Sequence, residues 1–133
     1  MPKVIPPVVG HDDEFFWSGV NDERLLIQSC ADCGVMRHPP SPMCASCHSV
    51  RATTTQSAGR GTVHSWVVSQ HPSQPDEVPR IVALVELKDG IRIVSNLQDV
   101  AVADVRNDMA VEVFFCRVDG VMLPQFRPVG AAK

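Results

Sequence analysis

The chain has 133 residues, with 12 lysines and arginines against 15 acidic residues, and a net charge of −3 at pH 7. This length suits one compact unit or two small ones, and it excludes a full dinucleotide-binding domain joined to a substrate domain. The acidic balance excludes a bulk positive field for binding nucleic acid or an anionic membrane, although a local patch remains open.

Residues 1–28 form a predicted N-terminal arm and helix. The first ten residues hold three prolines and are expected to be extended. Residues 12–28 are apolar enough for one or two short helices, with Gly19 as the expected break. The three aromatic residues at 15–17 either pack on the rest of the chain or face a partner subunit. No apolar run is long enough for a signal peptide or a membrane span, so we expect a cytoplasmic protein.

Residues 29–50 form a predicted metal ribbon, because they hold four cysteines and almost no core-forming residues. Cys30 and Cys33 are separated by two residues, as are Cys44 and Cys47, so each pair can point two thiolates at one tetrahedral ion. Gly34 suits the sharp turn of the first knuckle. Four sulfur ligands leave no open position, which predicts a structural zinc or iron ion, with zinc favoured. A ribbon that has lost its metal, or a pair of disulfides, remains the alternative.

A polar connector at 51–61 leads to five predicted strands, at 62–69, 81–87, 91–97, 110–118 and 121–129. Two of the joins contain Asp-Gly, which is typical of hairpin turns. The other two joins, 71–80 and 98–109, are longer and more polar, so we expect them to carry contacts. Five strands with uneven connections predict a mainly β chain with a small OB-fold barrel over 58–129; another small barrel or sandwich is the alternative.

Few other residues suggest chemistry. Cys116 is predicted to be a buried strand residue, with a reactive thiol as the alternative. The histidines show no catalytic or metal-binding spacing, and there is no glycine-rich phosphate loop. Arg60 is one of several arginines on or beside predicted loops, where a guanidinium can bind phosphate or carboxylate.

Several segments, in this order, resemble a family of small prokaryotic proteins made of a zinc ribbon and an OB-fold, which associate with acyl-CoA enzymes of the thiolase superfamily. Individually these segments are weak signals, but their order along nearly the whole chain is specific. They are Phe16-Trp17, Leu26-Ile27-Gln28, Cys30-Ala-Asp-Cys33-Gly34, Pro39-Pro40, Cys44-Ala-Ser-Cys47, Gly59-Arg60-Gly61-Thr62-Val63, Ala83-Leu84-Val85-Glu86-Leu87 with Asp89-Gly90, and Pro124-Gln125-Phe126-Arg127-Pro128.

The resemblance implies a rubredoxin-like zinc ribbon and a non-catalytic accessory subunit bound to a thiolase-like enzyme. Such a subunit helps to hold an acyl-CoA thioester during carbon–carbon bond formation or cleavage, such as sterol side-chain retro-aldol cleavage or acyl transfer. It also implies a two-plus-two heterotetramer, with a hydratase-like subunit as a second candidate partner. Carried over residue by residue, the four cysteines are the metal ligands and Arg60 is a contact for CoA or for the partner.

The sequence departs from the family pattern at two positions. His48 follows the second knuckle where the family has glycine, so a side chain must adopt the strained turn conformation. Ser41 follows Pro40 where arginine is common, which removes one candidate phosphate ligand.

A single-stranded nucleic-acid-binding module is the alternative function, because zinc ribbons and OB-folds also bind single strands through basic grooves and stacked aromatics. Aromatic residues are only 5% of the chain and tyrosine is absent, which argues against this alternative. A nucleic-acid binder should show salt-dependent retention on heparin.

Overall fold

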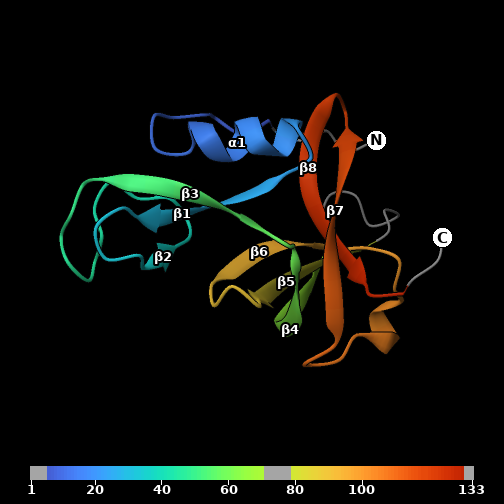
Figure 1. The fold of residues 1–133 in the computed structure, drawn as a ribbon. Coiled ribbons are helices and arrows are strands. Elements are labelled where there is room, and N and C mark those ends of the chain that lie inside the picture. Colours follow the sequence, from blue (N-terminus) through green and yellow to red (C-terminus); the bar gives the residue numbers. More distant parts are fainter. Residues whose placement is uncertain (1–5, 71–78, 131–133) are drawn as a thin grey trace. The chain divides into compact units, whose positions relative to one another are not determined.

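The computed structural model describes residues 6–70 and 79–130, and the chain divides into two compact units (Figure 1). Unit 1 comprises Met1–Ala58 and Phe115–Pro124, and unit 2 comprises Gly59–Phe114 and Gln125–Lys133. The chain is mainly β with one short α-helix, as predicted. The finer sequence-based division into 1–28, 29–50 and 58–129 stays a prediction.

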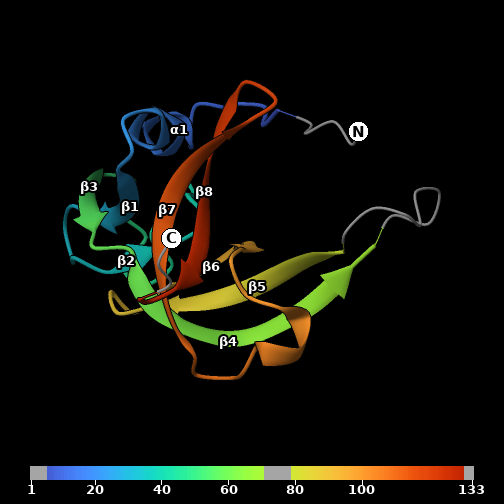
Figure 2. The ribbon, with the colours of Figure 1, turned by 90° about the vertical axis from the view of Figure 1, so that its right-hand side faces the viewer.

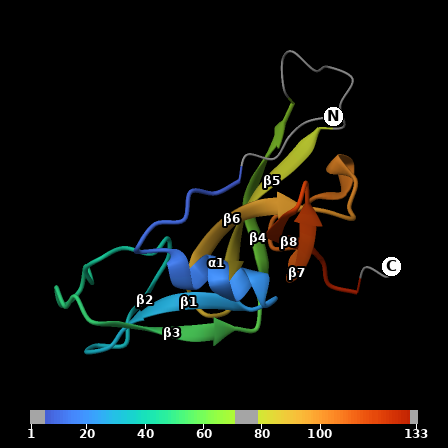
Figure 3. The same cartoon turned by 90° about the horizontal axis from the view of Figure 1, so that it is seen from above.

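Unit 1 is built on a small antiparallel sheet covered by a helix. Strands β1 (Leu25–Cys30), β2 (Met36–Arg37) and β3 (Ala52–Ser57) pair in the order β2-β1-β3. Helix α1 (Glu14–Asn21) contacts β1 and lies alongside it in Figure 3. At Gly19 an added Cβ would fall 2.8 Å from the side chain of Leu26, so the bare glycine permits this close approach.

The prediction of helix through residue 28 is wrong beyond Asn21. The helix continues past Gly19 for two residues, and the chain then turns and enters β1 at Leu25. β1 is the central strand, with β2 and β3 on either side, and five of its six side chains are buried. A short apolar run that is buried on both faces has no alternation, so periodicity alone cannot distinguish it from a buried helix.

The connector predicted at 51–61 also contains a strand, β3. Its first five residues are all exposed, so apolar and polar side chains do not alternate along it. Alternation therefore could not identify this segment as a strand. Three consecutive threonines still favour an extended backbone, because a β-branched side chain fits a pleated strand better than a helix.

The predicted five-stranded barrel belongs mainly to unit 2, while residues 115–124, which include parts of β7 and β8, belong to unit 1. The strands are β4 (Arg60–Ser69), β5 (Arg80–Leu87), β6 (Arg92–Leu97), β7 (Ala110–Val118) and β8 (Val121–Pro128). They form a closed barrel in the order β4-β5-β6-β8-β7, with β6 parallel to β8. The predicted strand boundaries agree with these to within two residues, and the expected barrel architecture is confirmed.

Alternation along the strands builds the barrel core. On β5 every second residue from Ile81 to Leu87 is buried, while the residues between them are half-buried or exposed. Figure 2 shows β4 and β5 running side by side along their length. The largest fully buried side chains of the barrel are Val63, Val85, Leu87, Val111 and Phe126.

The structure describes the whole of one longer join, at 98–109, and only the end of the other. The predicted contact loop at 71–80, including His71, falls mostly outside the described residues. The join at 98–109 contains a 3-10 helix, η1 (Val102–Asp104). Within residues 6–70 and 79–130, no helix combines the length and apolarity needed to cross a membrane.

Candidate functional site

The four cysteines of unit 1 converge on one point. Their Sγ atoms all lie within 4.8 Å of one another. The Sγ–Sγ distance is 3.5 Å between Cys30 and Cys47, and 3.6 Å between Cys33 and Cys44. Four sulfurs at 2.3 Å from a tetrahedral zinc ion would be about 3.8 Å apart, so the cluster needs little adjustment to fit the ion.

The two knuckles share one backbone pattern. The N–H of Cys30 donates to the Val35 carbonyl at 2.9 Å, and the N–H of Gly34 returns to the Cys30 carbonyl at 3.0 Å. In the second knuckle, Cys44 N–H donates to the Ser49 carbonyl and His48 N–H to the Cys44 carbonyl, both at 2.9 Å. The two loops therefore present their cysteines in equivalent ways.

His48 occupies the position in the second knuckle that Gly34 occupies in the first. The φ angle is +81° at Gly34 and +65° at His48, so both adopt the left-handed conformation. A residue with a Cβ is strained there by about 1–2 kcal/mol. The prediction that a side chain must take this strained position is confirmed.

Backbone groups and neighbouring sulfurs control the ionisation of the cluster. The N–H groups of Cys33 and Asp32 hold the pKa of the Cys30 thiol at about 6. The N–H of Ser49 lowers the pKa of Cys47, but the Cys30 sulfur and burial outweigh it and raise that pKa to about 12. The four sulfurs cannot all ionise at neutral pH without a cation, so the donor set fits a divalent metal and has no place for water.

Polar contacts outside the cluster hold the ribbon loops. The Gln28 amide donates to the Ser41 carbonyl at 2.9 Å and accepts from the Ser41 N–H at 2.8 Å. Arg37 also donates to the Ser41 carbonyl, at 2.9 Å. Asp32 accepts a hydrogen bond from Ser49 and forms an ion pair with Arg51 at 2.8 Å. Ser41, a departure from the family pattern, thus fixes the loop through its backbone.

Arg60 lies at the start of β4, within a small charged group on the barrel. Its guanidinium is 3.5 Å from the Glu112 carboxylate, which also accepts from Arg127 Nε at 3.4 Å. The Arg127 guanidinium stands 4.8 Å from the centre of the Phe114 ring. Two arginines share one carboxylate, so the group has an excess positive charge. Sequence reasoning singled out Arg60 but missed Arg127, although Arg127 lies in the C-terminal segment that carried the resemblance.

The glycines that flank Arg60 have structural roles. A Cβ on Gly61 would lie 2.2 Å from the Glu86 carbonyl oxygen, and a Cβ on Gly59 would lie 2.0 Å from a Val113 methyl. Both positions therefore require a bare backbone where β4 enters the barrel. Close packing at the start of β4 therefore accounts for both glycines of the Gly-Arg-Gly motif, and no ligand is needed to explain them.

The aromatic run on α1 divides between core and surface. Phe16 is 6% exposed, and its ring packs edge-on against Trp17 at 5.0 Å and near His38 at 5.4 Å. Phe15 and Trp17 are half-buried. Burial lowers the pKa of His38. Packing on the chain accounts for Phe16 and leaves part of Phe15 and Trp17 available for a partner.

Cys116 lies on β7 as predicted, but it is half-buried where full burial was expected. Burial raises the pKa of its thiol, which opposes reactivity. Phe126 is fully buried, so it cannot serve as a stacking platform for a nucleic-acid base.

The cysteine ribbon and the barrel each match a family model. Residues 17–50 match "ChsH2, rubredoxin-like zinc ribbon domain", and residues 54–115 match "ChsH2, C-terminal OB-fold domain". A chain of the solved structure described as "Ltp2-ChsH2(DUF35) aldolase" is 40% identical, with a TM-score of 0.85; the match covers 92% of this chain and 98% of that one. This chain belongs to the ChsH2/DUF35 family.

Curated relatives of this ChsH2/DUF35 chain include longer proteins. A "Probable enoyl-CoA hydratase alpha subunit" of Thermomonospora curvata is 40% identical over 96% of this chain and 41% of its own length. The "3-oxo-4,17-pregnadiene-20-carboxyl-CoA hydratase alpha subunit" of Mycobacterium tuberculosis is 41% identical over 82% of this chain and 35% of its own length. The chain thus spans about two-fifths of the length of these relatives.

A shorter relative has nearly the same extent as this ChsH2/DUF35 chain. A "DUF35 domain-containing scaffold protein" of Pyrococcus furiosus is 28% identical over 86% of this chain and 90% of its own length. Members of the family are therefore described as a scaffold and as subunits of hydratase and aldolase enzymes. The zinc ribbon, the OB-fold and the expected family are confirmed.

Proposed function

We propose that the chain is a non-catalytic accessory subunit that binds a thiolase-like enzyme and helps to hold an acyl-CoA thioester during carbon–carbon bond formation or cleavage. The observation that carries this proposal is the match along 98% of a chain of the Ltp2-ChsH2(DUF35) aldolase. The hydratase subunits among its relatives support a hydratase-like protein as a second partner, and the steroid-CoA name of one supports a sterol substrate.

In this proposal Cys30, Cys33, Cys44 and Cys47 hold a structural zinc ion, which keeps the ribbon folded. The converging Sγ atoms and the zinc-ribbon family match support the assignment. With four protein sulfurs bound, zinc would have no open position for a substrate or water, so its contribution is rigidity.

Arg60 would bind a phosphate of CoA or an acidic group of the partner. The shared carboxylate of Glu112 positions Arg60 and Arg127 side by side, and their combined charge exceeds that of the carboxylate. About half of the Arg60 side chain is exposed, so a ligand can reach it from solvent. A planar guanidinium with free donors suits the oxygens of a phosphate.

The outer face of β4, β5 and β6 supports binding to another protein. Val67 is 63% exposed and Val94 is 66% exposed. In the register of the sheet, Val67 is opposite Val82 and Leu84 is opposite Val94, so these side chains form one apolar stripe. Exposed apolar groups that are contiguous favour protein contacts.

Co-expression with a thiolase-like protein tests the accessory function. Size-exclusion chromatography with light scattering should give a complex with the mass of two copies of each chain. Separate elution of the two proteins would contradict the assignment and would direct the search to a hydratase-like partner. Retention on heparin that falls with salt would favour the nucleic-acid alternative.

Two variants test whether the half-buried aromatics contact the partner. Trp17→Ala should weaken the complex more than it lowers the melting temperature of the isolated chain, because part of the ring remains exposed. Phe16→Ala is the matched control, since Phe16 is buried and its loss should act mainly on stability. A larger effect of Trp17→Ala on the melting temperature than on the complex would indicate that Trp17 serves packing within unit 1.

A further inference from the structure

The outer edge of β3 presents a row of outward-facing backbone groups. The Ala31 N–H donates to the carbonyl of Arg51 at 3.0 Å, and continuing the β1–β3 register makes these residues direct opposites. Hydrogen-bonded and non-hydrogen-bonded pairs alternate along an antiparallel ladder. Thr53 and Thr55 therefore bond to β1, while the N–H and C=O groups of Ala52, Thr54 and Gln56 point outward.

A second hydrogen bond checks this assignment independently. The N–H of Cys30 donates to the Val35 carbonyl at 2.9 Å, so the Cys30 backbone faces the β2 side of the sheet. Its opposite residue, Ala52, consequently receives no ladder bond from Cys30. In the part of the chain that the structure describes, no other strand pairs with the outer edge of β3.

This edge lacks the features that normally protect an edge strand. β3 is six residues long, its register with β1 is unbroken, and it contains no charged residue and no proline. Residues 52–56 are all exposed. Natural sheets commonly block such an edge with lysine, proline or a bulge, because its free groups can pair with another chain.

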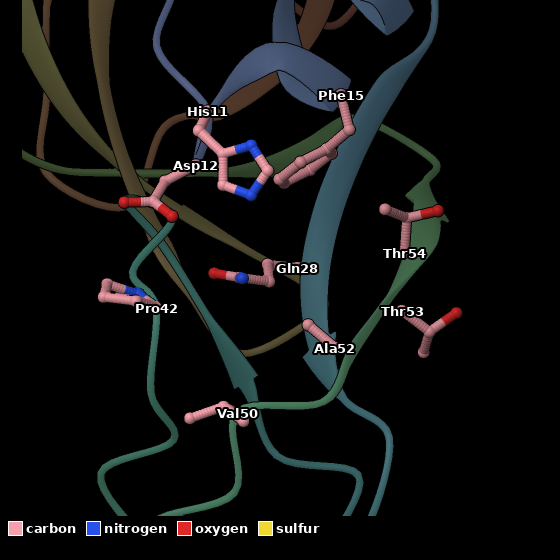
Figure 4. A pocket seen from close by; sticks show the side chains of 9 residues that line it. All are labelled: His11, Asp12, Phe15, Gln28, Pro42, Val50, Ala52, Thr53 and Thr54. Atoms are coloured by element: carbon pink, nitrogen blue, oxygen red, sulfur yellow. The ribbon is translucent and has the colours of Figure 1, made fainter.

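A solvent-open pocket of about 440 Å³ adjoins the edge within unit 1 (Figure 4). Thr54 and Gln28 are opposite each other in the register and form part of its floor. Thr53 also lines the pocket, although successive strand residues point to opposite faces, so the pocket reaches the edge itself.

The pocket combines apolar walls with one negative charge. Phe15, Pro42 and Val50 supply the apolar surface, and Asp12 is the only acidic residue of the lining among those that the structure describes. Within residues 6–70 and 79–130 no lysine or arginine lines the pocket, and two more acidic residues, Asp13 and Glu14, follow Asp12 in the chain. A long side chain with an apolar stem and a cationic head matches this combination.

We propose that the β3 edge and this pocket bind an extended segment of the partner subunit, which adds a fourth strand to the sheet and inserts an arginine or lysine side chain into the pocket. Strand addition draws affinity from main-chain hydrogen bonds and specificity from pockets for alternate side chains. The inference rests on the proposed function in taking the occupant from the partner. A second copy of β3 suits the site less well, because its uncharged side chains would leave Asp12 unmatched.

A peptide titration tests the site without the partner. The probe is acetyl-Thr-Val-Arg-Val-Thr-amide, added to the ¹⁵N-labelled full chain and followed by amide chemical shifts. Shifts should be larger at residues 52, 54 and 56 than at 53 and 55, because only the former have outward N–H groups. The same peptide with glutamate in place of arginine should bind about fivefold more weakly, the factor expected for one exposed ion pair.

Two variants test the contributions of the β3 edge and of the pocket separately. Thr54→Pro removes one outward N–H and should abolish peptide binding, whereas the matched control Thr54→Ala keeps that N–H and changes only a pocket-lining side chain, so it should lose far less affinity than Thr54→Pro. Asp12→Asn changes only an exposed residue, so it should fold normally and reduce the preference for arginine over glutamate. An unchanged preference in Asp12→Asn would overturn the role of the pocket.

Three further outcomes would overturn the inference. These are no shifts at millimolar peptide, equal shifts throughout 52–56, and shifts that depend on protein concentration without peptide, which would assign the edge to a second copy. In a complex with the thiolase-like protein, the amides of residues 52, 54 and 56 should exchange slowly with deuterium. Fast exchange there would contradict this inference while leaving the accessory function intact. Peptide binding by a chain that forms no complex with the thiolase-like protein would contradict the accessory function while leaving the peptide site intact.

Discussion

The ribbon and the barrel are stabilised in different ways. Between residues 29 and 50 the only buried side chains are Ser29, Cys30 and Cys44. The barrel instead encloses a continuous set of apolar side chains that includes Val63, Val85 and Phe126. A segment with so little apolar burial cannot offset its chain entropy alone, whereas the barrel can. The comparison teaches that a bound ion can stabilise the ribbon, where apolar burial is scarce, while the barrel depends on packing.

The largest expected effect comes from breaking the cysteine cluster. Cys44→Ser should release zinc and expose the amides of β1 and β2 to rapid hydrogen exchange, because structural zinc contributes about 10 kcal/mol of binding free energy in comparable sites. The amides of β5 should stay protected. Zinc content and exchange rates measure both effects, and Cys116→Ser, outside the cluster, is the matched control. Retained zinc in Cys44→Ser would remove the ligand assignment.

A core truncation should produce the opposite pattern. Phe126 is fully buried in the barrel, so Phe126→Ala should lower the free energy of unfolding by about 3–5 kcal/mol and leave the zinc content unchanged. Urea unfolding measures the loss. Val94→Ala, at a residue that is 66% exposed, should change stability by less than about 0.5 kcal/mol. Zinc loss in Phe126→Ala would show that the two regions are not independent.

A smaller effect is expected where two barrel strands approach closely. Gly61→Ala places a Cβ against the Glu86 carbonyl, 2.2 Å away, so the strands must shift. We expect a loss of about 2 kcal/mol, as for other overpacked sites. Thermal unfolding of the parent and the variant at equal zinc content would measure it. An unchanged melting temperature would mean that the glycine is not required by packing.

The smallest effect should come from the knuckle turns. His48→Gly removes the strain of a left-handed residue with a Cβ and should stabilise the zinc-bound chain by about 1 kcal/mol. Gly34→Ala introduces the same strain in the first knuckle, so it should destabilise by a similar amount. Competition with a zinc chelator at neutral pH would rank the three proteins. A destabilised His48→Gly would show that the imidazole contributes contacts that outweigh the strain.

The parts of the fold that sequence could predict are those with a local signal. The β5, β6 and β7 strands have apolar residues bounded by turns or polar loops, and their ends were predicted to within one residue. Leu25–Cys30 lacked alternation because both of its faces are buried, and Ala52–Ser57 lacked it because nearly all of it is exposed. In both cases the pairing partner decides the structure, and that partner lies far away in the sequence.

The candidate site shows the same division. The spacing of the cysteines predicted the cluster, because each pair lies within one knuckle. The strained conformation of His48 was predicted from the resemblance, because the family has glycine at this position. The pairing of Arg127 with Glu112 joins residues on two strands, and the outward groups of β3 depend on a ladder register. Neither has a local pattern that sequence reasoning could have used.

The most direct test of the central claim is turnover of an acyl-CoA thioester by the purified proteins. The chain alone should show no turnover, and adding it to the thiolase-like protein should raise the rate of carbon–carbon bond cleavage or formation. Turnover by the chain alone would contradict a non-catalytic role, and an unchanged rate in the mixture would contradict an accessory one.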